Sequence, residues 1–285
     1  FIGTDSGKLT TTGVGNTFVG DGSGKQNTTG ASNVAMGQSA LLANTTASNN
    51  TAVGYAALTA NTTGSENNAF GYGALYLNTT ALNNNAFGTL ALGANTTGAG
   101  NTAMGGNALD ANTTASNNTA VGYVALGANT TGTQNTAVGS LSLDANTTGN
   151  ENTAVGYAAL TTVTTASGNT ALGWGAMLST TTGYAGVAIG VSSLGVQTTG
   201  NQNVAVGSLT LDALTTGSLN TAVGQAAGGA VTTGIHNTFV GYTTGDATTT
   251  ASFNTAIGTA ALSANCGDGN TAIGHAAGTA ITGGE

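Results

Sequence analysis

Residues 50–66 read NTAVGYAALTANTTGSE, and the pattern returns as NNAFGYGALYLNTTALN at residues 67–83 and as NNAFGTLALGANTTGAG at residues 84–100. Each stretch has 17 residues and places Asn, Ala, Gly, Leu and Asn-Thr-Thr at the same distances from its start. We number the positions of every repeat from the leading Asn, which is position 1. A fixed period of this length indicates stacked structural units, as in a solenoid.

Position 5 is a glycine in every copy, and successive copies lie 17 residues apart except for a last step of 16. A glycine in every copy indicates a backbone position that needs positive φ or close approach of another backbone segment. We therefore expect this position to form a structural corner of each unit. The candidate corners include Gly54, Gly71, Gly88, Gly105, Gly122, Gly139 and Gly156.

The repeat content favours an all-β fold over stacked helices. Gly, Asn and Thr are weak helix formers, and no apolar stripe with a period of about 3.6 residues survives the Thr-Thr-Gly interruptions. We predict a parallel β-solenoid (β-roll) of 17-residue coils, with short strands such as residues 51–53. We expect residues 1–285 to be a single continuous solenoid of about seventeen repeats, a fragment of a longer array. A one-residue deletion makes residues 265–285 slightly irregular.

The side chains at each position suggest how a coil packs. Position 4 is large and apolar and position 9 is usually Leu, so we expect both in the core. Stacking should also align the Asn side chains of position 1 and the Thr side chains of positions 13 and 14 into ladders. Phe1, Phe18 and Phe239 replace the Ala of position 3 in coils where position 9 is Gly, which indicates volume compensation within one packing region.

The small residues at position 3 suggest how chains assemble. A monomer would leave one Ala-lined face in water, and we expect neighbouring chains to cover it, as in a homotrimer. The alanines of this face are Ala52, Ala69, Ala86, Ala103, Ala120 and Ala137.

Composition excludes several functions. Only 4% of residues are charged, the formal net charge is −8, and Lys8 and Lys25 are the only basic side chains. Because phosphate binding depends on clustered Lys and Arg, we expect no nucleic-acid partner. No apolar run in this fragment approaches the roughly 18 residues of a membrane span.

The sequence offers no catalytic motif, and we expect no enzyme, cofactor or metal site. Catalysis needs dissimilar groups that converge, whereas a ladder repeats one group. His236 and His275 lie at different repeat positions, and we interpret both as surface substitutions. Cys266, the one cysteine, is interpreted as a near-isosteric replacement of the Thr at position 13.

Two sets of residues are candidate carbohydrate sites. The Asn-Thr-Thr triplets match the acceptor pattern for N-glycosylation, although regular turn chemistry also accounts for them. Their asparagines are Asn27, Asn44, Asn61, Asn78, Asn95, Asn112, Asn129 and Asn146. Aromatic residues at position 6, directly after the corner, form a row that can stack on sugar rings or stand as scattered surface residues. They are Tyr55, Tyr72, Tyr123, Tyr157, Trp174 and Tyr242.

The motifs NTAVG and NTAIG, each followed by small residues, resemble the head repeats of YadA-type trimeric autotransporter adhesins. They are also similar to repeats of phage tail-fibre-like proteins. The resemblance covers nearly the whole chain and implies a left-handed parallel β-roll, three chains per fibre and a role in surface attachment.

We therefore expect a non-enzymatic structural fibre or adhesin segment that is extracellular, on a cell surface or on a virion surface. Its expected partners are copies of itself and a host or environmental surface, with carbohydrate as one candidate. An ice-binding protein, a glycan-decorated extracellular filament protein and a phage tail-fibre shaft remain alternatives. The adjacent Thr pair argues against ice binding, because in an extended strand its members would point to opposite faces.

Overall fold

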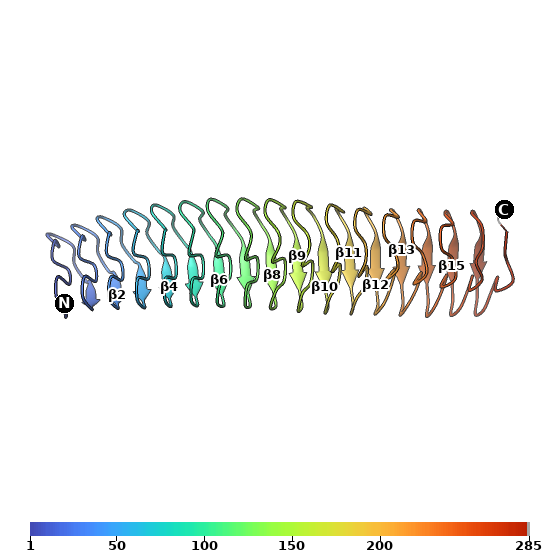
Figure 1. The fold of residues 1–285 in the computed structure, drawn as a ribbon, viewed down its shortest axis with the longest axis horizontal. Helices are drawn as coiled ribbons and strands as arrows, with labels where there is room; N and C mark the ends of the chain where they lie inside the picture. Colours follow the sequence, from blue (N-terminus) through green and yellow to red (C-terminus); the bar gives the residue numbers. More distant parts are fainter. Residues whose placement is uncertain (284–285) are drawn as a thin grey trace. The chain divides into compact units, whose positions relative to one another are not determined.

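The computed structural model describes residues 1–283, and these contain short strands and turns but no helix. The chain divides into two compact units, Phe1–Thr148 and Gly149–Glu285. Within each unit, the strands follow one another as successive coils of the chain (Figure 1). The predicted fold class is confirmed as an all-β parallel β-solenoid with 17-residue coils.

Every strand is three residues long. The first unit contains β1 (Thr17–Val19), β2 (Val34–Met36), β3 (Thr51–Val53), β4 (Asn68–Phe70), β5 (Asn85–Phe87), β6 (Thr102–Met104), β7 (Thr119–Val121) and β8 (Thr136–Val138). The second unit contains β9 (Thr153–Val155), β10 (Thr170–Leu172), β11 (Val187–Ile189), β12 (Val204–Val206), β13 (Thr221–Val223), β14 (Thr238–Val240), β15 (Thr255–Ile257) and β16 (Thr271–Ile273).

Strand pairing follows the sequence repeat. In each unit, a strand pairs in parallel with the next one along the chain, and paired residues such as Thr51 and Asn68 are 17 apart. The last pair of the second unit differs, because Thr255 pairs with Thr271 at a step of 16. The one-residue deletion therefore leaves the strand pairing intact.

Each strand turns its middle residue inward. In β3, Ala52 is fully buried, whereas Thr51 and Val53 on either side are half-buried. This alternation follows from the period of two along a strand. Position 3 is therefore the inner position and position 4 lies on the outer face, so our expectation of a core position 4 is wrong.

The same finding corrects the expected assembly face. The position 3 alanines are fully buried inside their own coil, so they cannot contact a neighbouring chain: Ala52, Ala69, Ala86, Ala103, Ala120 and Ala137.

The apolar core of a coil is formed by positions 3, 8 and 9. Ala52, Ala57 and Leu58 represent it, and none of them is exposed. Leu58 has a φ of 51°, in the left-handed region that costs an ordinary residue about 1–2 kcal/mol. Burial of its side chain and a 3.0 Å hydrogen bond from its N–H to the carbonyl of Ala74 hold it there.

The glycines of position 5 end the strands. Gly54 has a φ of +133°, a conformation that L side chains rarely adopt. A Cβ atom on Gly54 would lie only 2.5 Å from the carbonyl oxygen of Gly71 in the next coil. Both the backbone angle and the close approach of the coils therefore require glycine at this corner.

The predicted volume compensation between positions 3 and 9 is confirmed by direct contact. A Cβ atom on Gly24 would lie 2.6 Å from the ring of Phe18, so the ring fills the space that Leu occupies in other coils. The Phe239 ring lies 2.5 Å from the Cβ position of Gly245 and 2.9 Å from that of Gly228. The ring of Phe239 therefore fills the space above a position 9 glycine in each of two coils.

Asparagines form two hydrogen-bonded ladders inside the first unit. At position 1, the side-chain oxygen of Asn50 accepts a 2.9 Å hydrogen bond from the backbone N–H of Asn67. At position 12, the side-chain nitrogen of Asn61 donates to the side-chain oxygen of Asn44 over 3.0 Å. Asn50 and Asn61 both also donate to the carbonyl of Gly64, at 2.9 and 2.8 Å. Buried polar groups are thus paired both within and between coils.

The second unit keeps the ladder of position 1 except at Gly186, where one Asn is missing, and replaces the ladder of position 12. Its residues there are Val163, Thr180, Gln197, Leu214, Val231 and Thr248, all fully buried. Cys266 continues this inner column, because it is buried and its Sγ lies 3.4 Å from Oγ1 of Thr248. Our interpretation of Cys266 as a substitute for the outer Thr of position 13 is therefore wrong.

The threonines of positions 13 and 14 lie in a bend, not in a strand. Thr62 is half-buried and Thr63 is exposed. At position 13, the hydroxyl of Thr45 donates to the carbonyl of Thr62 over 3.0 Å. The threonines therefore do not lie in the extended strand on which the expectation of opposite faces rests, and Asn61 fills the interior beside them.

Candidate functional site: a tyrosine groove

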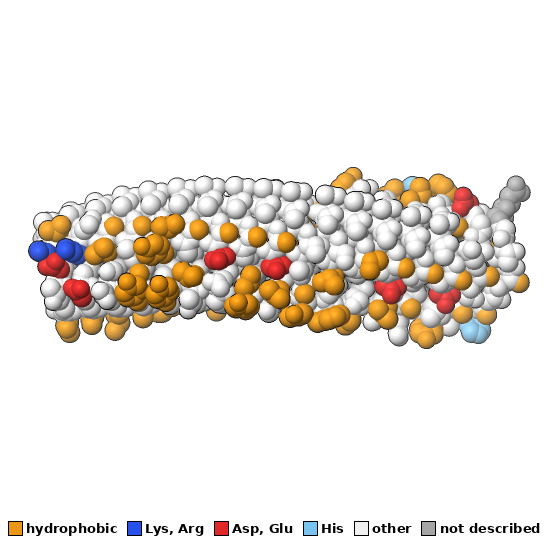
Figure 2. Space-filling model, viewed as in Figure 1, with side chains coloured by type: hydrophobic (Ala, Val, Ile, Leu, Met, Phe, Trp, Pro, Cys, Tyr) orange, Lys and Arg blue, Asp and Glu red, His pale blue; other side chains and the backbone are white. Residues whose placement is uncertain are grey.

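The aromatic residues of position 6 protrude from the solenoid surface. All six (Tyr55, Tyr72, Tyr123, Tyr157, Trp174 and Tyr242) are between 50% and 60% exposed. Figure 2 shows hydrophobic side chains gathered in clusters on a surface with few charges. Their position directly after the corner glycine turns them away from the core.

Two of these residues form a stacked pair in the first unit. The Tyr55 and Tyr72 rings have centroids 5.5 Å apart and planes inclined by only 8°. Because neighbouring coils are spaced by the strand separation of about 4.8 Å, rings at the same position in consecutive coils stack naturally. The pair forms one wall of a groove that follows the stack of coils.

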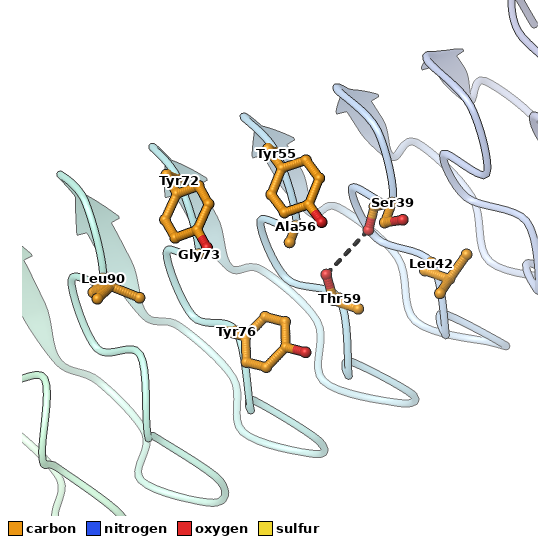
Figure 3. A pocket seen from close by; sticks show the side chains of 9 residues that line it. All are labelled: Ser39, Leu42, Tyr55, Ala56, Thr59, Tyr72, Gly73, Tyr76 and Leu90. Atoms are coloured by element: carbon orange, nitrogen blue, oxygen red, sulfur yellow. Dashed lines mark hydrogen bonds between the residues drawn. The ribbon is translucent and has the colours of Figure 1, made fainter.

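Tyr76 belongs to the opposite wall. It lies at position 10 of the same coil as Tyr72, and Ala56 and Gly73 lie between the two walls (Figure 3). The hollow encloses about 530 Å³. It exists because these two floor residues are small, whereas Leu90 fills the same position in the next coil.

Four further residues line the ends of the groove, and three of them belong to the flanking coils. Leu90 leans over the floor at one end, where its Cδ2 lies 2.8 Å from the Cβ position of Gly73. At the other end, Ser39, Leu42 and Thr59 complete the lining. The Thr59 hydroxyl donates to the carbonyl of Ser39 over 3.1 Å, which fixes the orientation of its methyl group (Figure 3).

The groove combines apolar faces with hydroxyl groups and carries no charge among its lining residues. Tyrosine offers a flat apolar ring together with a phenol that donates and accepts hydrogen bonds. Such a lining fits an uncharged ligand that presents apolar C–H faces and a rim of hydroxyls.

Sequence reasoning identified only part of this site. It selected Tyr55 and Tyr72 but missed Tyr76, Leu42 and Leu90, because positions 7 and 10 vary between copies. The available signal was a pair of consecutive aromatics at position 6 combined with small residues at position 7.

The other four aromatics do not line this groove. Tyr123 and Tyr242 have no aromatic neighbour at position 6, since Gly106 and Ser140 flank the first and Gln225 and Thr259 the second. Tyr157 and Trp174 occupy consecutive coils of the second unit.

The candidate glycosylation asparagines lie in the interior. Asn27, Asn44, Asn61, Asn78, Asn95, Asn112, Asn129 and Asn146 are all fully buried. They form the ladder of position 12, so this fold has no room for a glycan on their side-chain nitrogens. These asparagines are therefore not accessible as glycosylation sites in the folded chain, and their burial agrees with the structural alternative.

Ionic contacts occur away from the groove, in the first two coils. Asp5 contacts Lys8 at 2.9 Å and Lys25 at 2.7 Å. The hydrogen bonds from Lys25 and Lys8 lower the pKa of Asp5 to about 2, and the same contact with Asp5 raises the pKa of Lys25. The shared carboxylate allows two lysines to occupy the same position in consecutive coils.

His236 lies on the surface of the second unit, where its ring stacks on Phe253 with centroids 5.2 Å apart. Within residues 1–283, no three His, Cys, Asp or Glu side chains gather as metal ligands. No helix that could cross a membrane is found in the described part of the chain.

Comparison of the chain with protein-family models, curated proteins and solved structures finds no match.

Proposed function

We propose that this protein is a non-enzymatic structural segment of an extracellular fibre or adhesin that attaches to a surface by binding neutral carbohydrate. The observation that carries this proposal is the uncharged hollow between the Tyr55–Tyr72 pair and Tyr76. The resemblance of the NTAVG motif to adhesin and tail-fibre repeats supports the same function.

The chemistry of the groove favours a sugar over other small ligands. A pyranose ring has an apolar face of C–H groups that packs on an aromatic ring, and its edge carries hydroxyls. Three tyrosines, Ser39 and Thr59 line the same hollow, and their hydroxyl groups can pair with such an edge. The absence of charge in the lining disfavours phosphorylated or acidic ligands.

The interior supports a structural role. Each coil is joined to its neighbours by strand pairing, by the Asn ladder of position 1 and by stacked core residues. A chain of this kind repeats one contact many times and so supplies length and rigidity. We propose that it is displayed outside the cell, on a cell surface or on a virion.

We also propose that the coils are left-handed and that chains assemble as homotrimers, as the family resemblance implies. The surface that supports assembly is the outer face of position 4, which replaces the buried alanines in this role. In the first unit it presents half-exposed apolar side chains in every coil, and Phe70 and Phe87 stack with centroids 4.8 Å apart. A continuous apolar stripe of this kind is typical of a protein interface.

Ice binding is a second candidate, and the exposed threonines of position 14 favour it. Thr46, Thr63 and Thr80 represent this rank, which continues through the first unit. The alternative predicts thermal hysteresis of the purified protein, which the carbohydrate proposal does not.

Binding to an array of immobilised neutral oligosaccharides tests the proposed function. Ala56→Leu should fill the groove floor and weaken the retention of the full chain on this array. Leu already occurs at this position with nearly the same backbone, since φ is 56° at both Ala56 and Leu90. Tyr123→Ala removes an isolated aromatic and serves as the matched control. If no neutral glycan is retained by the unaltered protein, the proposal is wrong.

A further inference from the structure

The sequence around the tyrosine groove recurs in the second unit. GYAALT at residues 54–59 returns at residues 156–161, and GYGALY at residues 71–76 returns as GWGAML at residues 173–178. The two copies are 102 residues apart, which is six repeats of 17. Aromatic residues occupy position 6 in consecutive coils at these two places only.

The backbone of the two copies has the same geometry. The floor glycines Gly73 and Gly175 have φ values of 61° and 60°. The N–H of Gly73 donates to the backbone carbonyl of Tyr55 over 3.0 Å, and the N–H of Gly175 donates to the backbone carbonyl of Tyr157 over the same distance. The backbone therefore presents the second pair of aromatics as it presents the first.

No neighbouring side chain fills the space above the second floor glycine, although Gly175 itself is buried. A Cβ atom on Gly175 would meet only Oγ of Ser192, at 3.9 Å. Tyr157 and Trp174 at position 6 and Leu178 at position 10 are all exposed, so they flank this floor as Tyr55, Tyr72 and Tyr76 flank the first. No charged side chain occupies these three positions, whereas the sequence counterparts of Leu42 and Ser39 are Asp144 and Leu141, which belong to the first unit.

Among the differences between the two copies, the one beside the floor glycine concerns the end of the groove. Ser192 stands where the first groove has Leu90, the side chain that closes the end over Gly73. Serine is too short to reach across the floor, so this end stays open toward the next coil. An oligosaccharide can then extend past Trp174, whereas Leu90 would stop it in the first groove.

From these observations we infer that the second unit contains its own carbohydrate site, built on Tyr157 and Trp174, that binds neutral oligosaccharides longer than those held by the first groove. This inference rests on the proposed function of the first groove. It assigns to the chain two sites of one chemical class that differ in the length of the sugar they accept.

Trp174 supplies a signal that belongs to the second site alone, because it is the single tryptophan of the chain. The full chain is titrated with cellobiose and cellohexaose, maltose and maltohexaose, and chitobiose and chitohexaose. Tryptophan emission reports the second site, and calorimetry reports both sites. Ala56→Leu fills the floor of the first groove, and Ala158→Leu fills the floor of the second. Ser192→Leu gives the second groove a closed end like the one that Leu90 forms in the first.

We expect at least one hexasaccharide to change Trp174 emission in the unaltered chain and in Ala56→Leu. Ala158→Leu should lower the affinity measured by that emission change about tenfold, because the added side chain separates the aromatic rings from the sugar. Ser192→Leu should lower the affinity of the second site for the hexasaccharide to its affinity for the disaccharide. Its affinity for the disaccharide should not change. Leu209 carries a φ of 55° at the same repeat position, so leucine suits this backbone, and circular dichroism verifies folding.

Two outcomes overturn the inference in distinguishable ways. If calorimetry detects binding that Ala56→Leu abolishes while Trp174 emission stays constant, only the first groove binds sugar and the proposed function stands. If none of the probes gives heat or an emission change, the second site and the proposed function both fail.

Discussion

Asn61 donates a hydrogen bond from its side-chain nitrogen to the side-chain oxygen of Asn44, one coil earlier, over 3.0 Å. The same relationship links Asn78 to Asn61 at 2.9 Å and Asn95 to Asn78 at 3.0 Å. Because all of these side chains are fully buried, each amide depends on its neighbours for its hydrogen bonds. The first unit is therefore sensitive to the loss of any single member of the ladder.

Asn78→Val tests the ladder. The change leaves the buried side-chain oxygen of Asn61 without its donor, and we expect the free energy of unfolding to fall by about 2 kcal/mol. Denaturant unfolding measures the difference. Thr80→Val, at an exposed position of the same coil, should leave the midpoint unchanged. Equal effects of the two substitutions would contradict the ladder's role.

Phe18 and Gly24 should behave as an exchangeable pair. Phe18→Ala leaves a cavity and should cost about 3–4 kcal/mol, and Gly24→Leu should overpack against the ring. The double variant recreates the Ala–Leu pair of Ala35 and Leu41, and Gly24 already has a φ of 56° where Leu41 has 54°. A double-mutant cycle by thermal unfolding should therefore show strong favourable coupling. Additive effects would contradict the shared packing space.

Gly156→Val should disrupt one coil of the second unit. Gly156 has a φ of +135°, and a Cβ atom there would collide with the carbonyl of Gly173, so we expect a loss of about 3 kcal/mol. Gly168→Asn in the same coil is the control. Gly168 has a φ of 71° at a repeat position where Asn49 adopts 61°, so its stability should change by less than about 0.5 kcal/mol.

Asp144 makes stability depend on pH. Burial raises the pKa of its carboxyl above the usual 3.8, although backbone N–H groups partly oppose the shift. The folded state then binds the proton more tightly than the unfolded state, so stability falls as the pH rises through the raised pKa. Asp144→Asn should unfold at higher denaturant concentration than the unaltered chain near neutral pH, with no advantage at about pH 3. Glu66→Gln, an exposed carboxyl, is the control.

The apolar stripe of position 4 should mediate self-association. Phe87→Lys places a charge on the half-exposed outer face, and we expect it to prevent assembly while the coils stay folded. Ala120→Arg should instead unfold its coil, because Ala120 is fully buried. Light scattering and circular dichroism distinguish the two effects. Phe87→Lys assembling like the unaltered protein would contradict this interface, and exposed Thr97→Lys controls for added charge.

The period of the repeat predicted the coil length, the parallel strands and the corner glycines. It did not predict which side of the strand faces inward, because Ala at position 3 and Val at position 4 are both apolar. The sequence did contain a signal for the inner position. Phe18 replaces the usual Ala of position 3 in a coil where Gly24 replaces the usual Leu of position 9, and residues that compensate in volume share one space. Tyr76 was missed because a groove depends on where side chains are small, at Ala56 and Gly73, as much as on where they are large.

The short step between β15 and β16 has an evolutionary consequence. A coil that loses one residue in its bend still pairs Thr255 with Thr271 and Ile257 with Ile273. Bends thus tolerate small changes in length. The loss or gain of a whole coil by slippage during DNA replication would bring together coils whose contacts are already present elsewhere in the chain. Genes for such chains can change in length without a new packing solution, so closely related copies should differ most readily in coil number.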